Sequence, residues 1–510
     1  MNSNRKWFDR PGRVRGPVAR IAAVIAVLMA GLYILGPSIS VQAVRLAPAA
    51  AAAEAGVGEG FPEYLPVIFQ TFNAPSIFGV EMTTINPGLV LTMVKDMGSY
   101  WMRNTALLWS EVEPVNNGGY QWSNVDNLEA ELIATSQAGM QTVLVVRSTP
   151  SWAQLFPGVL CGPMQQAYFD DFGDFLVATV NRYSVPPYNV RHFEIWNEPD
   201  VDSTKVPPDQ VYGCWGDKNK PLYGGEYYGS MLKVVYPMMK AANPSITVLV
   251  GGLLLDCDPR NPPPGKTCHP SYFLEGILTA GAKNSFDGIS FHAYDFYNAT
   301  LNTFGNPNWN SGKYNNELNG SLRPVLINKV DFIEEVLAAF NVTGKILINT
   351  ESALLCGGSF DPPGQPPCDA VDTSPYEIMK AAYAAQVFPA AIGEGLAANL
   401  WFTVTGWRNS GLVYTDKTPR PAYHAFDFSE SMLLHADYKA PVLGYPMITG
   451  YKFDLLNGHD LWIVWAWTGG PKVMNLPNVP LAIWDATGDP VTVTGTTVTL
   501  TVEPYYLEMP

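Results

Sequence analysis

From residue 77 onward the chain alternates between short, almost wholly apolar segments and longer segments in which apolar residues recur with helical spacing. Continuous apolar runs rich in β-branched residues are typical of parallel strands that are covered on both faces. The strand-like runs cover residues 78–82, 101–108, 142–147, 192–196, 246–251, 288–292, 345–349 and 398–404. The main helical patterns cover residues 125–138, 165–183, 226–242, 272–280, 325–340 and 377–392. The pattern therefore predicts eight strands separated by helices.

Alternation of strands and helices indicates βαβ units with right-handed crossovers. Eight such units predict an α/β fold, a (β/α)₈ TIM barrel with enlarged loops, over residues 62–436. The alternative is a doubly wound open sheet. It is weakened because no Gly-x-Gly-x-x-Gly turn follows the first strand-like run.

The pattern changes after about residue 434, where apolar and polar residues alternate with period two and break at Asn-Gly, Gly-Gly and Gly-Asp-Pro. Such segments are typical of short antiparallel strands joined by turns. We expect a small antiparallel β-sandwich over residues 437–510. Its tryptophans could form a sugar-binding face, but we expect them to be core or packing residues. They are Trp462, Trp465, Trp467 and Trp484.

The N-terminus differs from the rest of the chain. Six basic residues and one acidic residue fall in the first 20 positions, and residues 21–36 are apolar and uncharged. Residues 1–46 are therefore predicted to be a signal peptide, with small residues at Val41 and Ala43 for cleavage, or else a membrane anchor. Residues 47–61 resemble an Ala-rich linker. Either alternative places the body outside the cytoplasm, secreted or anchored to the membrane.

Charge and composition narrow the choice of partners. The formal net charge is −15, and without the +5 of the first 20 residues the remainder carries about −20. So acidic a body would repel phosphate backbones, so we do not expect nucleic acid as a partner. Aromatic residues make up 12% of the chain and charged residues only 15%, which suits neutral ligands with flat apolar faces, such as sugars.

Six cysteines, all in the predicted exported part, indicate disulfides. Two pairs bracket Pro/Gly-rich loops and are natural local partners, which leaves the third pair to each other. These pairs are Cys257 with Cys268, Cys356 with Cys368, and Cys161 with Cys214. Free buried thiols are the alternative. A zinc site is disfavoured because no Cys-x-x-Cys pair occurs.

In a (β/α)₈ barrel the chemistry lies at the carboxyl ends of the strands. Two glutamates, Glu198 and Glu351, fall at the ends of the fourth and seventh predicted strands. Two carboxyl groups facing each other, one protonated and one ionised, are what cleavage of a glycosidic bond requires. Other polar or aromatic residues at strand ends are Arg103, Asn104, Arg147, Ser148, Asn197, His292, Tyr294, Asn349, Thr350 and Trp401.

Four of these strand ends resemble motifs of clan A glycoside hydrolases. "EIWNEPD" looks like their acid/base signature, "ILINTES" like their nucleophile strand, "FHAY" like their sixth strand and "LWFTVTGW" like their eighth. The resemblance covers roughly residues 75–435, with the motifs in the order of the clan. Members of the xylosidase/iduronidase type and the cellulase type are the most similar.

The resemblance implies a role for each matching residue. Glu198 would be the general acid/base and Glu351 the nucleophile of a retaining double displacement. Asn197 would hold the substrate 2-hydroxyl. Tyr294 would donate a hydrogen bond to Glu351, and Arg103 would pair with the same carboxylate and keep it ionised.

Two further residues complete the implied substrate site. His292 would line the same side of the substrate site as Tyr294. Trp401 would be the platform under the sugar at the point of cleavage. One departure concerns the third strand, where many cellulase-type members have a histidine. Here the segment reads "VVRSTPSWA", and Arg147 or Trp152 takes that space. This departure leaves the sugar undefined.

The sequence thus predicts a retaining β-glycosidase acting on a polysaccharide or oligosaccharide, without cofactor. No metal is expected, because the six histidines show no ligand spacing. The alternative is a non-catalytic carbohydrate-binding or cell-surface protein on a hydrolase barrel. An inverting mechanism is the minor option among enzymes. Glu194, four residues before Glu198, is expected to have a structural role.

Overall fold

The computed structural model describes residues 76–82, 88–207, 209–211, 213–309, 323–357, 368, 371–467 and 470–510 of the 510-residue chain. The predicted signal peptide or anchor and the linker lie outside the described residues. Within the described ranges, no helix combines the length and the apolar character that crossing a membrane requires.

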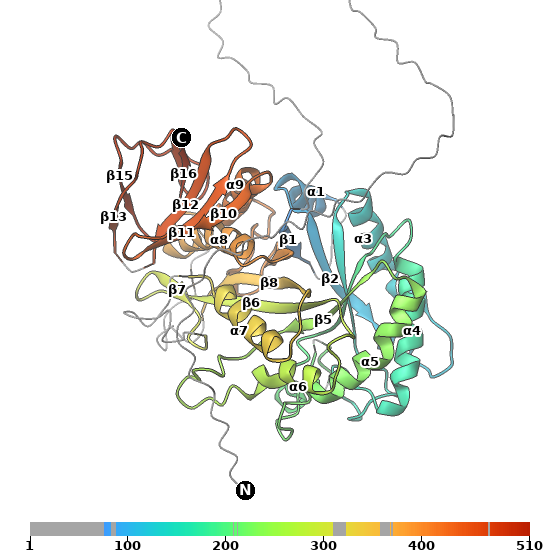
Figure 1. Ribbon diagram of the computed structural model, residues 1–510. Helices are drawn as coiled ribbons and strands as arrows, with labels where there is room; N and C mark the ends of the chain where they lie inside the picture. Colours follow the sequence, from blue (N-terminus) through green and yellow to red (C-terminus); the bar gives the residue numbers. More distant parts are fainter. Residues whose placement is uncertain are drawn as a thin grey trace, which may run out of the picture. The chain divides into compact units, whose positions relative to one another are not determined.

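Eight parallel strands form a closed ring (Figure 1). Their order is β5-β4-β3-β2-β1-β9-β8-β6, and pairing of β5 with β6 closes the barrel. The strands are β1 (Phe78–Glu81), β2 (Trp101–Leu108), β3 (Gln141–Arg147), β4 (His192–Asn197), β5 (Thr247–Leu253), β6 (Gly288–Asn298), β8 (Ile346–Leu355) and β9 (Ala398–Phe402). The predicted TIM barrel and all eight of its strands are confirmed.

Helices follow the strands, and all six predicted helical segments are present. The α-helices are α1 (Leu89–Asp96), α2 (Trp109–Val112), α3 (Asp126–Gln137), α4 (Phe169–Tyr183), α5 (Gly225–Ala242), α6 (Phe273–Thr279), α7 (Leu326–Ala339), α8 (Pro375–Gly393) and α9 (Pro421–Leu433). Short 3₁₀ turns are η1 (Trp122–Val125), η2 (Gln166–Tyr168), η3 (Ser203–Lys205), η4 (His269–Tyr272) and η5 (Trp407–Asn409). Helix α4 is representative: Phe172, Leu176 and Val180 recur at helical spacing and are fully buried.

Strands β6 and β8 are longer than the other barrel strands. Their pairing continues to Phe296 opposite Leu355, beyond the point where their neighbours end. A short strand, β7 (Thr303–Gly305), then pairs antiparallel with the last residues of β6. The two strands therefore form an extension that rises from the carboxyl end of the barrel.

The C-terminal strands form separate antiparallel sheets, as predicted. Five strands follow the order β10-β11-β12-β16-β14, and β13 pairs with β15. These strands are β10 (Asp437–Pro441), β11 (Ile448–Asp454), β12 (Asp460–Ala466), β13 (Lys472–Asn475), β14 (Ala482–Trp484), β15 (Thr497–Leu500) and β16 (Tyr505–Met509). Trp462 and Trp465 are buried, which confirms them as core residues, whereas Trp467 and Trp484 are half-buried.

The five-stranded sheet packs on the last two helices of the barrel. The Tyr506 hydroxyl on β16 lies 2.6 Å from Ser429 Oγ on α9 and donates to the carbonyl of Ala385 on α8. Gln386 on α8 donates to the carbonyl of Val502 at 2.6 Å. The predicted boundary at residue 436 falls between α9 and β10. That the two parts are separate domains stays a prediction.

All three predicted cysteine pairs are disulfides: Cys161–Cys214, Cys257–Cys268 and Cys356–Cys368. Cys161 and Cys214 follow β3 and β4, Cys257 and Cys268 follow β5, and Cys356 follows β8 directly. Every bridge therefore ties loops at the carboxyl ends of the strands, on the face of the barrel where the strand-end residues lie.

Candidate active site

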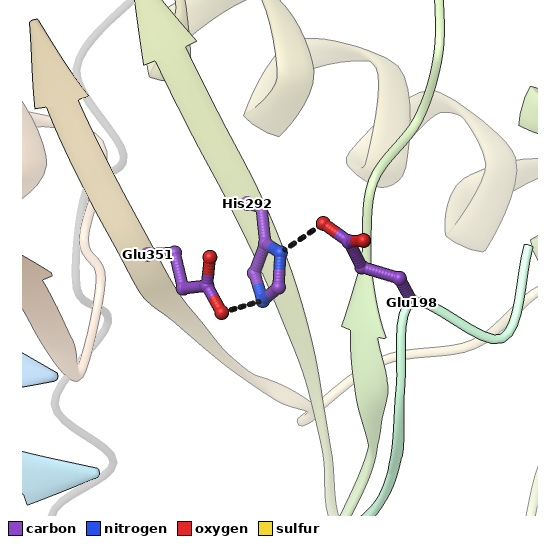
Figure 2. A group of neighbouring side chains, drawn as sticks. All are labelled: Glu198, His292 and Glu351. Carbon is purple, nitrogen blue, oxygen red and sulfur yellow. Dashed lines mark hydrogen bonds and ion pairs between the residues drawn. The ribbon is translucent and has the colours of Figure 1, made fainter. Parts of the chain in front are cut away.

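Glu198 and Glu351 come from opposite sides of the barrel mouth and point toward each other across His292 (Figure 2). Glu198 follows the last residue of β4, with φ of +39°, and its amide donates to the Gly252 carbonyl on β5. Glu351 lies inside β8, because that strand continues past the predicted end. One oxygen from each carboxyl group and one His292 nitrogen all lie within 4.8 Å of one another.

His292 on β6 links the two carboxyl groups. Its Nδ1 lies 2.9 Å from Glu198 Oε1, and its Nε2 lies 3.4 Å from Glu351 Oε1. Burial lowers the pKa of His292 to about 4, so the ring is neutral near pH 7 and carries a single N–H. A consistent arrangement has protonated Glu198 donating to Nδ1, with the ring hydrogen on Nε2 on the side of Glu351. A Cβ at position 252 would lie 2.2 Å from Nε2, so β5 requires glycine there.

Glu351 accepts a hydrogen bond on each oxygen. Arg103 Nη1 donates to Oε1 at 2.5 Å, and the Tyr294 hydroxyl donates to Oε2. The guanidinium is fully buried and permanently charged. Two donors, one of them cationic, suit a carboxylate that must remain an anion. The structure thus brings Arg103 and Tyr294 to the residue that the sequence assigned them to.

The second Arg103 side-chain nitrogen, Nη2, binds two residues of β4, which is separated from β2 by β3. Nη2 lies 2.6 Å from Glu194 Oε1 and 2.6 Å from Asn197 Oδ1, both on β4. Glu194 is fully buried and also accepts from the Gly252 amide at 3.2 Å. Its contacts fit the structural role expected for it. Asn197 has its amide oxygen occupied, which fixes the direction of its Nδ2 group.

Glu198 differs from Glu351 in its electrostatic surroundings. Burial raises the pKa of Glu198 to about 7, although the positive charges of Arg103 and Lys329 act in the opposite direction. Its side chain keeps 23% exposure, whereas that of Glu351 keeps 9%. The site therefore holds one carboxyl group that is protonated up to neutral pH and one that is surrounded by donors.

A buried lysine behind Glu198 was not recognised in the sequence. Lys329 on α7 donates to the carbonyls of Leu254 at 2.6 Å and His292 at 2.7 Å. Burial lowers its pKa to about 8, so it is mostly charged at neutral pH. The helical pattern contains the signal, because Lys329 lies three residues after Leu326 and four before Ile333, both of them buried.

Two buried acids near the site were also missed. Asp200 accepts from the amides of Leu254 and Leu255 at 2.9 and 2.7 Å, and burial raises its pKa to about 7. Glu81 ends β1 in register with Arg103. Burial, followed by the charge of Glu351, raises the pKa of Glu81 to about 8. Inspection of the end of the first strand would have found Glu81 by the rule that found Glu351.

Trp401 does not lie where the resemblance implied. Its side chain is fully buried, packs on Tyr383, and donates its indole N–H to the Ser410 carbonyl. A side chain without exposed surface cannot contact a sugar ring. Its neighbour Phe402 is half-buried, points to the other face of β9 and lies edge-on to Tyr294, with ring centroids 5.8 Å apart. Phe402 therefore lies next to Tyr294, the residue whose hydroxyl donates to Glu351.

Both candidates for the third-strand position have partners of their own. Arg147 is buried and donates to the carbonyls of Thr105 and Val211. Trp152 is half-buried, and its indole N–H donates to the Glu113 carbonyl at 3.0 Å. The two residues fix loops around the mouth.

Glu198, His292 and Glu351 present the types of atom that bind a divalent cation, within 4.8 Å of one another. However, the Arg103 guanidinium lies 2.5 Å from Glu351 Oε1. A fixed positive charge at that distance would repel a second cation. The geometry favours two carboxyl groups acting directly, and the expected absence of a metal stays a prediction.

Comparison with known proteins shows that this fold is similar to those of several solved structures. A family 39 glycoside hydrolase from the gut symbiont Bacteroides cellulosilyticus WH2 is similar, with a TM-score of 0.62 at 19% identity over 86% of this chain and 81% of that one. A family 30 subfamily 8 xylanase from Clostridium acetobutylicum has a TM-score of 0.54 at 12% identity, over 85% and 96%. A conserved exported protein from Bacteroides fragilis has a TM-score of 0.56 at 12% identity, over 81% and 88%.

No family model matches the sequence, and no curated protein matches it. The likeness therefore lies in the fold. Its structural neighbours include glycoside hydrolases of families 39 and 30, and the predicted resemblance to clan A is confirmed at that level.

Proposed function

We propose that the protein is a glycoside hydrolase that cleaves β-glycosidic bonds with retention of configuration. One observation carries this proposal: carboxylate oxygens of Glu198 and Glu351 lie within 4.8 Å of each other. Retaining enzymes hold their two carboxyl groups about 5–5.5 Å apart, whereas inverting enzymes need about 6.5–9.5 Å to admit a water molecule. The observed separation supports retention rather than inversion.

In the first step Glu351 attacks the anomeric carbon, and the bond to the leaving oxygen breaks. Glu198 gives its proton to that oxygen, so the aglycone leaves neutral and Glu351 carries the glycosyl group. In the second step Glu198, now ionised, takes a proton from water. The resulting hydroxide attacks the anomeric carbon, which releases the sugar and returns Glu351 to its anionic form.

The remaining site residues serve these two steps. Arg103 and Tyr294 hold Glu351 as an anion, and His292 fixes the direction of the Glu198 carboxyl group. Asn197, held by Arg103 through its amide oxygen, donates from Nδ2 to the substrate 2-hydroxyl. Phe402 takes the platform position that the resemblance gave to Trp401.

We further propose that the substrate is an oligosaccharide or polysaccharide and that the protein acts outside the cytoplasm. Three disulfides tie the loops of the mouth, and disulfides persist in oxidising compartments. The N-terminal segment would be cleaved or would tether the body to a membrane. Expression with and without a signal-peptidase inhibitor separates these alternatives. A product whose mass rises with the inhibitor is normally cleaved, and a product of unchanged full-length mass keeps the segment.

The test is hydrolysis of a panel of aryl β-glycosides, β-glucans, xylans and mannans by the full chain. It is run beside Glu198→Gln, Glu351→Gln and the control Glu334→Gln, an exposed glutamate on α7. We expect loss of turnover by about 10³-fold or more in both site variants and no change in the control. Proton NMR of the first product should show the β-anomer.

Three outcomes would contradict the proposal. Turnover that survives Glu351→Gln would assign the nucleophile elsewhere. An α-anomer as first product would indicate inversion. Oligosaccharide binding without turnover on any substrate would favour the carbohydrate-binding protein that the sequence left as the alternative.

A further inference from the structure

One tryptophan at the mouth of the barrel exposes more than half of its surface. Among the four tryptophans near the loops that follow the strands, Trp109 and Trp215 are buried and Trp152 is half-buried. Trp407, in η5 after β9, has 57% of its surface exposed. A single exposed apolar side chain is ordinary on a protein surface, so a role for Trp407 has to rest on its position.

Trp407 stands at the end of an aromatic strip that begins at the catalytic pair. His292, Tyr294 and Phe296 follow one another on the same face of β6 and cover about 13 Å of the extension. The Arg408 guanidinium lies over the Phe296 ring at 5.4 Å and over the Trp407 ring at 5.3 Å. The strip therefore leads from Glu198 and Glu351 outward over a distance that spans several sugar rings.

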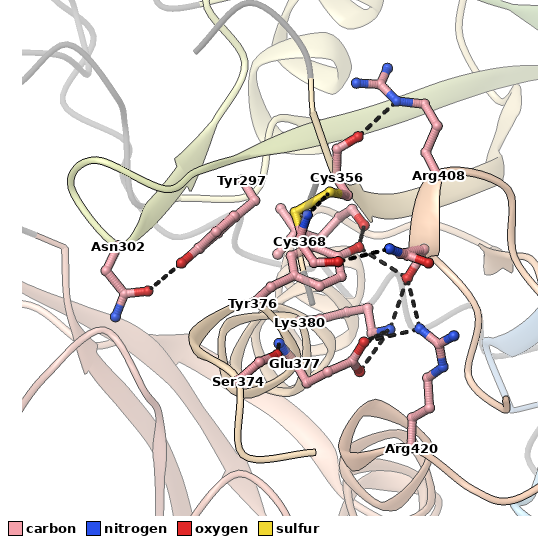
Figure 3. The surroundings of a disulfide bond; sticks show 12 residues. Tyr297, Asn302, Cys356, Cys368, Ser374, Tyr376, Glu377, Lys380, Arg408 and Arg420 are labelled. Carbon is pink, nitrogen blue, oxygen red and sulfur yellow. Dashed lines mark hydrogen bonds and ion pairs between the residues drawn. A yellow bond between two sulfur atoms is a disulfide. The ribbon is translucent and has the colours of Figure 1, made fainter. Parts of the chain in front are cut away.

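The loop that carries Trp407 is fixed to the end of β8 next to a disulfide (Figure 3). The Cys356 amide donates to the Arg408 carbonyl at 3.0 Å, and Arg408 Nε donates to the Cys356 carbonyl at 2.8 Å. Asn409 Nδ2 donates to the Cys368 carbonyl at 3.1 Å. Arg408 and Asn409 both have left-handed backbones, with φ of 52° and 59°. Such conformations persist only where the surroundings impose them.

A buried ion cluster fixes the same loop from below. The Asn409 carbonyl accepts from Lys380 Nζ at 2.9 Å and from the Tyr376 hydroxyl at 3.0 Å. Glu377 pairs with both Lys380 and Arg420 at 2.9 Å (Figure 3). Burying three charges is unfavourable in itself, so the cluster is evidence for a loop held in one conformation rather than for added stability. A preorganised ring loses little entropy when a ligand binds to it.

We propose that Trp407 is a sugar-binding platform in a distal subsite, which takes the far end of an oligosaccharide whose scissile bond lies between Glu198 and Glu351. This inference rests on the proposed function and deepens it, because it makes a chain of several sugars the preferred substrate. An indole face supplies the flat apolar surface that the axial C–H groups of a pyranose ring cover. The strip on β6 and Arg408 lie along the path between the two ends.

The test compares substrates of different length on the full chain. For Trp407→Ala we expect kcat/KM to fall roughly tenfold on the longest oligosaccharide and by less than about twofold on the aryl monoglycoside of the same sugar. Trp407→Phe keeps an aromatic face and should retain most of the activity on the long substrate. Tyr438→Ala, which removes an exposed aromatic residue of β10, should change neither.

Each other outcome overturns the inference. Equal losses on both substrates would mean that Trp407 acts through the fold or the catalytic pair, and no loss on either would mean that it contacts no sugar. A wild type that cleaves nothing would instead refute the proposed function. In that event, the affinity for the long oligosaccharide, measured by calorimetry, tests the role of Trp407 separately. A roughly tenfold weaker affinity in Trp407→Ala supports a sugar-binding platform, and an unchanged affinity overturns it.

Discussion

At the scale of single residues, the position of Lys329 decides how the acid is tuned. Its ammonium group lies behind His292, holding that residue's carbonyl at 2.7 Å, and its charge opposes the rise in the Glu198 pKa. Arg103 acts on Glu198 in the same direction. The pKa of about 7 is thus a balance between burial and the positive charges of Arg103 and Lys329.

This balance predicts both the pH profile and its response to mutation. Glu198 must be protonated to act as the acid, so kcat/KM should fall as pH rises through about 7. Removing the charge with Lys329→Met should raise the pKa of Glu198 and move this basic limb to higher pH. Kinetics across pH 5 to 9 on an aryl glycoside with a poor leaving group measure both effects, since such a group needs the proton.

Lys345→Met is the matched control. Lys345 also donates to a backbone carbonyl, that of Phe286, but it precedes β8 at the opposite end of the barrel. Its removal should leave the basic limb in place. A limb that stays fixed in Lys329→Met, or that moves to lower pH, would show that another group titrates.

Single residues also show where sequence reasoning reached its limit. The strand-end rule found Glu198, Glu351, Arg103 and Tyr294, because parallel strands bring their carboxyl ends together whatever lies between them. It selected Trp401 over Phe402 by residue type, although alternation sends the two side chains to opposite faces of β9. Which of two neighbours faces the lumen depends on register, and one strand by itself does not reveal it.

At the scale of elements, the extension of β6 and β8 connects the catalytic pair to the loops above it. The sequence placed the ends of these strands at residues 292 and 349, whereas the structure continues them to Asn298 and Leu355. Beyond the barrel the two strands pair mainly with each other, and polar residues such as Asp295 enter the pattern. A local apolar run does not indicate that β6 and β8 pair beyond the barrel, because this pairing depends on a partner strand more than 50 residues away.

The disulfide at the top of this extension should matter for long substrates. In the Cys356→Ser, Cys368→Ser double variant we expect the loop of Arg408 and Asn409 to loosen. The value of kcat/KM on a long oligosaccharide should then fall several-fold, with little change on an aryl monoglycoside.

The Cys257–Cys268 pair supplies the control, because it closes a loop of nearly the same length. The sequence separations are 11 and 12 residues. Loss of either bridge should destabilise the protein by a similar amount, about 3 kcal/mol. If both double variants lose activity on long substrates equally, the effect comes from general destabilisation and the role given to the Cys356–Cys368 bridge is wrong.

At the scale of the whole molecule, the C-terminal sheet is joined to the barrel through buried polar contacts on α8 and α9. Tyr506→Phe removes a hydroxyl that meets Ser429 Oγ and the Ala385 carbonyl in a buried environment. We expect the free energy of unfolding to fall by about 1–3 kcal/mol, because the Ala385 carbonyl loses this donor without access to water, while Ser429 keeps only its bond to the Ala425 carbonyl.

Tyr505→Phe, the preceding residue on the same strand, faces the other way and is half-buried. Its effect should stay within about 0.5 kcal/mol. Urea unfolding followed by circular dichroism measures both variants. Equal effects would mean that the contact with the barrel helices contributes nothing particular to stability.

At the scale of the whole molecule, the sequence predicted that the parallel barrel strands are followed by antiparallel strands. The hydrophobic period and the composition change together near residue 434. The packing of the second part on α8 and α9 was not predicted. Those helices are apolar on more than one side, with α8 buried along most of its length, and a sequence does not say which layer covers which side.

The contacts of Arg103 can form only when the barrel is closed. Its guanidinium on β2 touches β4 through Glu194 and Asn197 and touches β8 through Glu351, and none of these strands are neighbours in the sheet. The three can meet only across the lumen of a closed ring. During refolding, recovery of turnover should therefore coincide with the last strand pairing, so an activity assay would time ring closure more directly than a spectroscopic signal of helix content.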